Sequence, residues 1–289
     1  MSPHQTHRKL LSTTNHDRDD AALRYVYPVV SRRAGGVSVG INLNPNNACN
    51  WRCVYCQVPE LTRGAAPAID MALLEIELRG FLDELLHGNF MLDRVPKGSR
   101  HINDIAFSGN GEPTSAAEFT QVIDLIARIR RDTMLPEKVK TVLITNGSLL
   151  YRSSVQQGLR EMAKLEGEVW FKMDRASEVG ILKVNDIRMN IGKVRDNLIA
   201  AIACCPTWLQ TCWFAMDGEP PSLQDEDDYL EFVSTLLRDG HKPRGVLLYS
   251  LARTSMQPEA SSLSALSQEQ LQTFADRINK LGLTVKVTP

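Results

Sequence analysis

The sequence of 289 residues has no excess of charge of either sign. Its 33 Lys and Arg residues are balanced by 34 Asp and Glu residues, which leaves a formal net charge of −1. A protein that collects nucleic acid nonspecifically needs an overall positive field, so the whole chain does not belong to that class. A local basic patch is not excluded by this balance.

Long apolar runs and a disulfide framework are missing as well. No stretch approaches the roughly 18 apolar residues of a membrane span. The six cysteines are too few and too unevenly placed for a secreted disulfide scaffold. The segment 1–20 is polar, ends in Asp17-Arg-Asp-Asp20, and lacks the apolar core of a signal peptide. We therefore expect a protein of the reducing cytoplasm.

Internal repeats and low-complexity linkers are absent, which favours one domain over residues 25–289 preceded by a flexible tail over 1–24. Within the domain, short apolar runs typical of strands alternate with longer runs of helical periodicity. Strands are expected at 37–43, 101–107, 138–145, 169–173, 209–215, 245–251 and 284–287. Helices are expected at 71–86, 116–129, 153–165, 191–203, 225–237 and 267–281.

This alternation predicts an α/β fold in which parallel strands are joined by right-handed crossovers. A complete eight-fold barrel of this type takes about 250 residues, whereas a similar length here gives six units and a short last strand. The sequence therefore predicts a partial, TIM-like (β/α)6 barrel. In such folds the ligand site lies at the carboxyl ends of the strands.

Three cysteines follow the first of these strands, in the run Cys49-Asn-Trp-Arg-Cys53-Val-Tyr-Cys56. A four-iron cubane cluster normally takes four cysteine thiolates, so three thiolates leave one iron open to a small molecule. Structural zinc, the alternative, requires four closed ligands, and no fourth cysteine is nearby. A ferredoxin-like electron carrier would also need a fourth thiolate and a much smaller fold.

Polar residues gather after several other strands. The loop Ser108-Gly-Asn-Gly-Glu-Pro-Thr114 has two glycines and a proline, which favour a tight turn with backbone groups open to a ligand. Asn146, Lys172 and Arg253 follow or end later strands. Lys172 is a candidate for a Schiff base with a carbonyl substrate, or a charge partner of a carboxylate such as Asp174. Arg253 can bind a carboxylate or phosphate, or form a structural salt bridge.

The cysteine run and the glycine-glutamate-proline loop together resemble those of the radical S-adenosylmethionine (SAM) superfamily. Several other runs are similar to the group that includes the wyosine-base synthase, which acts on transfer RNA. They are Gly40-Ile-Asn-Leu-Asn-Pro45, Cys56-Gln-Val-Pro59, Thr145-Asn-Gly147, Trp170-Phe-Lys-Met-Asp174 and Leu248-Tyr-Ser-Leu-Ala-Arg253. The likeness extends from about residue 25 to the C-terminus.

The resemblance implies two cofactors, a [4Fe-4S] cluster held by Cys49, Cys53 and Cys56, and SAM bound at the open iron. It implies that an electron from a flavodoxin or ferredoxin type of donor cleaves SAM, and that the 5'-deoxyadenosyl radical abstracts hydrogen from a substrate. A nucleoside in RNA, a protein glycyl residue and a small metabolite are the candidate substrates. The implied SAM-binding residues are Tyr55, Ser108, Gly109, Gly111, Glu112, Pro113, Asn146 and Asp174, and the candidate catalytic residues are Lys172 and Arg253.

Cys204, Cys205 and Cys212 lie in apolar surroundings and are expected to be buried small hydrophobes, not ligands of a second cluster. The wyosine synthase carries an additional cluster bound by N-terminal cysteines, and this chain has no cysteine before Cys49. An iron–sulfur electron-transfer protein without SAM chemistry is the alternative function. We also expect that Gly111→Val weakens SAM binding more than cluster assembly.

Overall fold

A computed structural model describes residues 10–11, 23–30 and 35–289 of the chain. Its centre is an eight-stranded sheet with the strand order β1-β2-β5-β6-β7-β8-β10-β12. The strands are β1 (Val26–Val30), β2 (Val37–Ile41), β5 (Ile102–Phe107), β6 (Lys140–Thr145), β7 (Gly167–Lys172), β8 (Thr207–Cys212), β10 (Val246–Tyr249) and β12 (Val285–Thr288). All neighbours from β2 to β12 pair in parallel, whereas β1 is antiparallel to β2.

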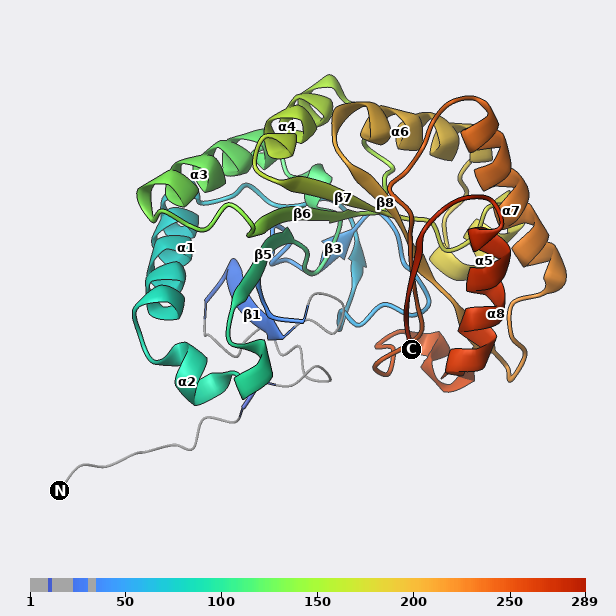
Figure 1. The fold of residues 1–289 in the computed structure, drawn as a ribbon, viewed down its shortest axis with the longest axis horizontal. Coiled ribbons are helices and arrows are strands. Elements are labelled where there is room, and N and C mark those ends of the chain that lie inside the picture. Colours follow the sequence, from blue (N-terminus) through green and yellow to red (C-terminus); the bar gives the residue numbers. More distant parts are fainter. Residues whose placement is uncertain (1–9, 12–22, 31–34) are drawn as a thin grey trace.

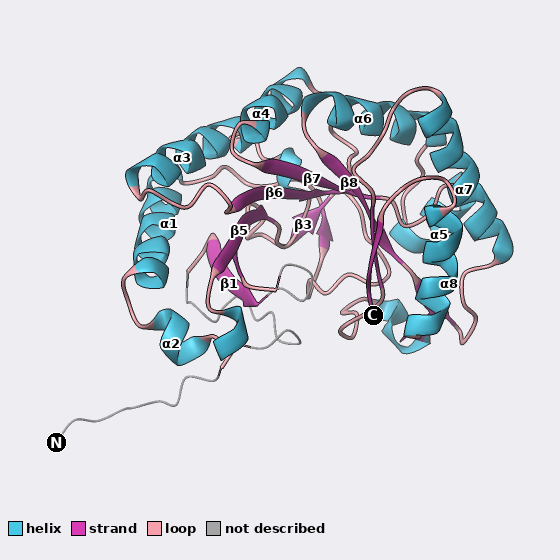
Figure 2. Ribbon diagram, in the orientation of Figure 1, coloured by secondary structure: helices cyan, strands magenta, loops and turns pink. Residues whose placement is uncertain are grey.

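The helices lie on the outside of this curved sheet. In Figure 1, α1, α3, α4, α6, α7 and α8 form an arc with the strands inside it, and Figure 2 shows the same arc in cyan around the magenta sheet. The helices are α1 (Met71–Leu86), α2 (Phe90–Arg94), α3 (Phe119–Asp132), α4 (Ser153–Ala163), α5 (Glu178–Asn185), α6 (Ile191–Cys204), α7 (Leu223–Arg238) and α8 (Gln268–Asn279). The strand order begins at β1 and ends at β12, so the described sheet is an open, partial barrel.

Short elements complete the strand ends. The paired strands β3 (Ala48–Cys49) and β4 (Thr62–Arg63) enclose the cysteine loop, and β9 (Phe214–Met216) pairs with β11 (Leu263–Ala265). The 3-10 helices are η2 (Lys97–Ser99), η3 (Pro113–Ser115) and η4 (Pro258–Ser262). Since β3 follows β2 directly, the cysteine loop begins at the carboxyl end of a central strand.

Burial of apolar side chains explains the packing. Every residue of β2 is buried, as expected for a parallel strand covered on both faces. Leu74, Leu78 and Leu82, spaced four residues apart, form the buried face of α1. Trp213, just after β8, stacks on Phe274 of α8 with ring centroids 4.4 Å apart. These contacts belong to one continuous core that runs under the arc of helices.

The predicted partial barrel is confirmed, and each predicted strand and helix has a counterpart with nearby ends. The sequence analysis does not predict the helices α2 and α5, the edge strand β1 or the short strands β3, β4 and β11. Pro28 in the middle of β1 removes a backbone donor and argues against a strand, but an edge strand tolerates proline. At the edge of the sheet, Pro28 lies opposite Val39 of β2.

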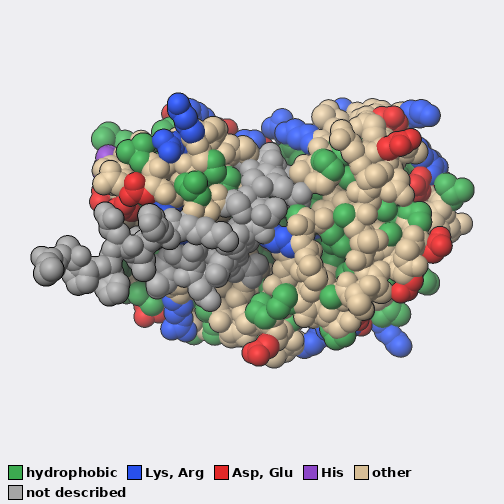
Figure 3. All heavy atoms as spheres, turned by 90° about the horizontal axis from the view of Figure 1, so that it is seen from below, with side chains coloured by type: hydrophobic (Ala, Val, Ile, Leu, Met, Phe, Trp, Pro, Cys, Tyr) green, Lys and Arg blue, Asp and Glu red, His purple; other side chains and the backbone are tan. Residues whose placement is uncertain are grey.

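The predicted tail over 1–24 falls mainly outside the described residues. Of the part that is described, Leu11 is buried, and its backbone N–H donates to the carbonyl oxygen of Arg94 over 2.8 Å. Among the described residues, no helix combines the length and apolarity needed to cross a membrane. On the face seen in Figure 3, basic and acidic side chains are both distributed over the surface, in keeping with the balanced charge.

Candidate active site

A cavity of about 310 Å³ lies at the carboxyl ends of the strands, where the sequence predicts the site. The cysteine loop, the glycine loop after β5, and the ends of β6, β7, β8 and β10 all contribute to its wall. Its lining includes the following predicted residues: Cys49, Cys53, Tyr55, Cys56, Ser108, Gly109, Gly111, Glu112, Asn146, Lys172 and Arg253. Pro113 and Asp174, the other two predicted residues, are not in the lining.

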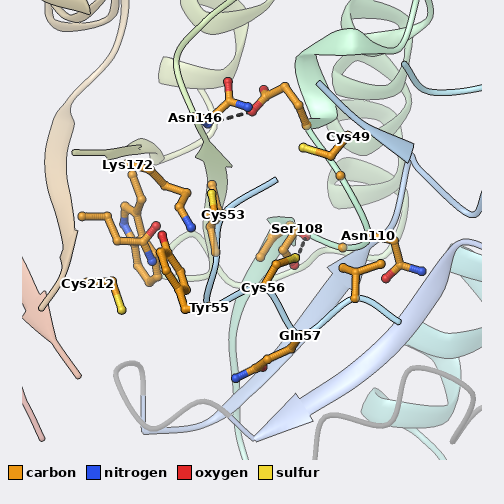
Figure 4. A pocket seen from close by; sticks show the side chains of 18 of the residues that line it. Cys49, Cys53, Tyr55, Cys56, Gln57, Ser108, Asn110, Asn146, Lys172 and Cys212 are labelled. Atoms are coloured by element: carbon orange, nitrogen blue, oxygen red, sulfur yellow. Dashed lines mark hydrogen bonds between the residues drawn. The ribbon is translucent and has the colours of Figure 1, made fainter. Parts of the chain in front are cut away.

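The three motif cysteines all face this cavity and are partly accessible (Figure 4). Two N–H groups point at their sulfur atoms: the side-chain amide of Asn185 lies 3.2 Å from Cys53 Sγ, and the backbone N–H of Trp51 lies 3.5 Å from Cys49 Sγ. Burial raises the pKa of the Cys49 thiol to about 12 and that of Cys53 to about 11. Cysteine thiolates are the ligands of iron–sulfur clusters, and N–H groups directed at their sulfur atoms tune the reduction potential.

Among the described residues, no three His, Cys, Asp or Glu side chains gather closely enough to hold a single metal ion. A cubane makes a different demand, because each cysteine thiolate binds its own iron and the sulfurs stand apart around the cluster. Three thiols on one loop, facing one cavity, fit that demand.

The cysteine loop is held by the end of α5. The backbone N–H of Val54 donates to Val184 O over 2.9 Å, and that of Arg52 donates to Asn185 O over 3.3 Å. The Arg52 side chain forms ion pairs with Asp186 (2.7 Å) and Glu259 (2.8 Å). These contacts come from segments more than 100 residues away in the sequence, so the loop geometry is fixed by tertiary structure.

The glycine loop packs directly against the cysteine loop. Gly109 has φ +143°, which side chains disfavour. A Cβ at Gly111 would stand 2.1 Å from the carbonyl oxygen of Ala48, the residue before the first cysteine. The glycine is therefore required where the glycine loop packs against the cysteine loop, and the contact of this loop with a ligand stays a prediction.

Glu112 joins the glycine loop to the end of β6. Its buried carboxylate accepts hydrogen bonds from the Thr114 N–H (3.1 Å), the Thr145 hydroxyl (2.7 Å) and the Asn146 N–H (2.7 Å). Burial raises the pKa of Glu112, and these hydrogen bonds oppose the rise. Asn146 in turn donates to Asn50 in the cysteine loop over 2.8 Å. One network thus links three loops around the cavity.

Lys172 forms part of the cavity lining, whereas Asp174 lies outside it. Asp174 lies behind Tyr55 and accepts from its hydroxyl (2.5 Å), from Asn185 Nδ2 (2.9 Å) and from the backbone N–H of Cys212 (2.9 Å). Lys172 does line the cavity, with Nζ 4.6 Å from the centroid of the Tyr55 ring. Burial lowers the pKa of Lys172, but Tyr249, Asp174 and the nearby thiols outweigh this and leave the pKa raised.

Arg253 lies in the loop that follows β10, and it lines the cavity together with the end of that strand. Its Nη1 donates to Gln57 Oε1, next to the last motif cysteine, over 2.8 Å. Arg253 is therefore tied to the cysteine loop while it faces the cavity.

Sequence reasoning missed several residues of the site. Asn42 accepts the backbone N–H of Asn110, at 3.1 Å, and it lies within the run 40–45 whose similarity was noted. Cys212 was expected only as core, and it is buried but also lines the cavity. Asn185 ends a helix that was not predicted, and no local signal marks it. All three act through contacts with distant segments.

No model of a known protein family matches the sequence. Similar curated proteins include one named GTPase Obg from Brachyspira hyodysenteriae, 25% identical over 276 residues, and a UPF0026 protein of Helicobacter pylori, 31% identical over 135 residues. These alignments cover 93% and 46% of this chain but only 36% and 38% of those proteins. The chain thus spans less than two-fifths of the length of these relatives.

Solved structures resemble the chain more completely. A variant of spore photoproduct lyase has a TM-score of 0.57 at 10% identity, and the match covers 99% of this chain and 86% of that one. TYW1 with a lysine-pyruvate adduct bound also has a TM-score of 0.57, at 13% identity over 84% of this chain and 73% of its own. A radical SAM methyltransferase from Sphaerobacter thermophilus has a TM-score of 0.55, at 14% identity over 88% and 66%.

The chain has the fold of the radical SAM enzymes. The cysteine loop follows β2, the first of the parallel strands, and therefore lies at the carboxyl ends of the strands. The name GTPase belongs to the Brachyspira protein, and the present sequence contains no Gly-x4-Gly-Lys-Ser/Thr run of the kind that cradles nucleotide phosphates.

Proposed function

We propose that this protein is a radical SAM enzyme, in which Cys49, Cys53 and Cys56 hold a [4Fe-4S] cluster and SAM binds at the iron without a cysteine. The observation that carries the proposal is the convergence of three thiols, the glycine loop and Asn146 on one cavity. When bound and reduced, the cluster supplies the electron that cleaves SAM to methionine and a 5'-deoxyadenosyl radical. The electron comes from a donor of the flavodoxin or ferredoxin type.

The chain's own groups position SAM. The turn from Ser108 to Gly111 leaves backbone groups at the cavity wall, where they can bind the amino group of methionine. Tyr55 is fixed by its hydrogen bond to Asp174 and lines the cavity beside Cys53 and Cys56, a place that suits contact with adenine. Asp174 and Pro113 are buried beside this wall and are not part of the cavity lining. Enclosure by these loops excludes water from the reacting groups.

Lys172 and Arg253 are the cations that this cavity offers to a substrate or to the carboxylate of SAM. Lys172 lies over the Tyr55 ring, and a cation so placed is stabilised in its charged form. A lysine must lose its proton before it can attack a carbonyl group. We therefore propose that Lys172 binds an anionic group, in contrast to the lysine adduct named for TYW1.

A nucleoside in RNA is the substrate class that we test first. It is supported by the sequence runs similar to the wyosine-synthase group, including Trp170-Phe-Lys-Met-Asp174, which ends β7 at the cavity. A protein glycyl residue and a small metabolite remain the other arms of the test.

The experiment is anaerobic reconstitution with iron and sulfide, followed by incubation with SAM, a strong one-electron reductant and each candidate substrate. We expect about four irons per chain, by analogy with other three-cysteine cubanes, and release of 5'-deoxyadenosine. Mass spectrometry of the substrate identifies the product. An intact cluster without any 5'-deoxyadenosine would instead favour the electron-transfer protein, and material that binds no iron would refute both functions.

A further inference from the structure

Asn185 is a buried residue whose side chain lies within hydrogen-bond distance of one of the motif cysteines. It ends α5, is 1% exposed, and its side-chain nitrogen is 3.2 Å from Cys53 Sγ. The same nitrogen is 2.9 Å from Asp174 Oδ2. An asparagine amide carries two N–H bonds, so one can point at the sulfur while the other points at the carboxylate.

The orientation of this amide is fixed by its surroundings. A carboxylate only accepts hydrogen bonds, so the nitrogen of Asn185, not its oxygen, must face Asp174. Asp174 is itself held by donors from Tyr55 and from the Cys212 backbone. The amide is also held through its main chain, because Asn185 O accepts the N–H of Arg52. The N–H aimed at Cys53 is thus set from two sides.

We propose that Asn185 is a positioning residue that raises the reduction potential of the cluster through its hydrogen bond to Cys53. The inference rests on the proposed function, since it needs Cys53 to be a cluster ligand. An N–H directed at a ligating sulfur withdraws electron density and stabilises the reduced, more negative cluster. Burial strengthens the effect because the local dielectric is low. No bond is made or broken by Asn185 itself.

Two of the three motif cysteines, Cys53 and Cys49, differ in the N–H group that points at their sulfur atoms. Cys53 has a side-chain N–H at 3.2 Å and also feels the positive charge of Lys172, whereas Cys49 has a backbone N–H at the longer distance of 3.5 Å. A substitution at position 185 changes the donor to Cys53 and leaves the backbone donor to Cys49 in place. The potential therefore reports on Asn185 separately from loop folding.

The test is a redox titration of the anaerobically reconstituted full-length protein, followed by the electron paramagnetic resonance signal of the reduced cluster. Asn185→Leu keeps the approximate shape and removes the N–H, and Asn185→Ser shortens the donor. Asn197→Leu is the matched control, because Asn197 is also a buried helical asparagine but belongs to α6 and not to the helix end that holds the cysteine loop. Iron and sulfide content are measured for each protein.

We expect Asn185→Leu to hold the cluster and to lower the ratio of reduced to oxidised cluster about tenfold at a fixed solution potential, which is a shift of about 59 mV for one electron. Asn185→Ser should show a smaller shift in the same direction, and Asn197→Leu none. An unchanged potential in a fully loaded Asn185→Leu protein would overturn the inference. So would failure of both Asn185 variants to load while the control loads, because the role would then be structural. A wild-type protein without a cluster would instead refute the proposed function.

Discussion

At the scale of single residues, the cavity is lined by four cysteines, and only three belong to the cluster motif. Cys49, Cys53 and Cys56 lie on one loop, whereas Cys212 comes from the end of β8 and packs with Tyr55 and Phe214. Burial raises the pKa of the Cys212 thiol as it does for Cys49 and Cys53, so Cys212 differs from the motif cysteines in its place in the fold. The two kinds of cysteine therefore offer a direct comparison within one site.

We predict that Cys53→Ala abolishes cluster binding, because each motif thiolate would be the only protein ligand of its iron. The measurement is iron content and visible absorbance after anaerobic reconstitution. Cys212→Ala is the matched control and should retain the cluster. A Cys53→Ala protein with the wild-type spectrum would contradict the ligand assignment, as would loss of the cluster in Cys212→Ala alone.

For substitutions of Gly111, the structure leads to a different prediction from the sequence. Its added Cβ would meet Ala48 O at 2.1 Å, so Gly111→Ala already displaces the loop that carries Cys49. We now expect cluster content to fall together with SAM affinity, and the larger Gly111→Val to be worse. Gly80→Ala is the control, because nothing lies within 4 Å of its Cβ, and alanine should stabilise α1 by about 1 kcal/mol. Gly111→Ala with full cluster content would show that the two loops can separate.

Residues of the site that belong to a local sequence motif could be predicted, whereas those that depend on contacts with distant segments could not. The cysteine triplet and the glycine loop could be predicted because each is a local run whose spacing carries the chemistry. The partners of Asp174 could not, because Tyr55, Asn185 and Cys212 reach it from three distant segments. The structure places Asp174 outside the cavity lining and against the Tyr55 hydroxyl, and its contact with SAM stays a prediction.

At the scale of elements, the alternation of short apolar runs with longer helical runs was enough to locate the parallel strands and the outer helices. It failed for α5, an eight-residue helix whose exposed Val179 and Leu182 blur the apolar periodicity. That failure matters because the end of α5 supports the cysteine loop. The helix whose end holds the cysteine loop could therefore not be predicted from the apolar periodicity of the sequence.

Glu112 connects the loops that follow β5 and β6 through hydrogen bonds to its carboxylate. We predict that Glu112→Ala destabilises the protein by about 3 kcal/mol, because donors from Thr114, Thr145 and Asn146 lose their acceptor in a buried place. Urea unfolding measures the change as a lower midpoint at unchanged slope.

Two further variants make this test specific. Glu112→Gln keeps one carbonyl acceptor and should lose clearly less stability, and Glu137→Ala removes an exposed glutamate and should have little effect. Equal stability of Glu112→Ala and Glu137→Ala would mean that the network does not hold the two loops together.

At the scale of the whole molecule, the cavity is lined by loops and strands from β1 to β10, so a ligand bound there would contact several strands of the sheet. A ligand that binds only the folded state stabilises it by about 2.7 kcal/mol at one hundred times its Kd. For a chain of this size that corresponds to a rise in Tm of roughly 5 to 10 °C. We predict this rise on addition of SAM to the protein that holds its cluster, and a much smaller one for the protein without iron, because the open iron supplies part of the binding.

Differential scanning fluorimetry under anaerobic conditions compares the two forms, with Cys53→Ala as a third sample that should behave like the iron-free protein. An equal rise in all three samples would show that SAM binds without the cluster, and the proposed link between the cysteine loop and the cofactor would then be wrong.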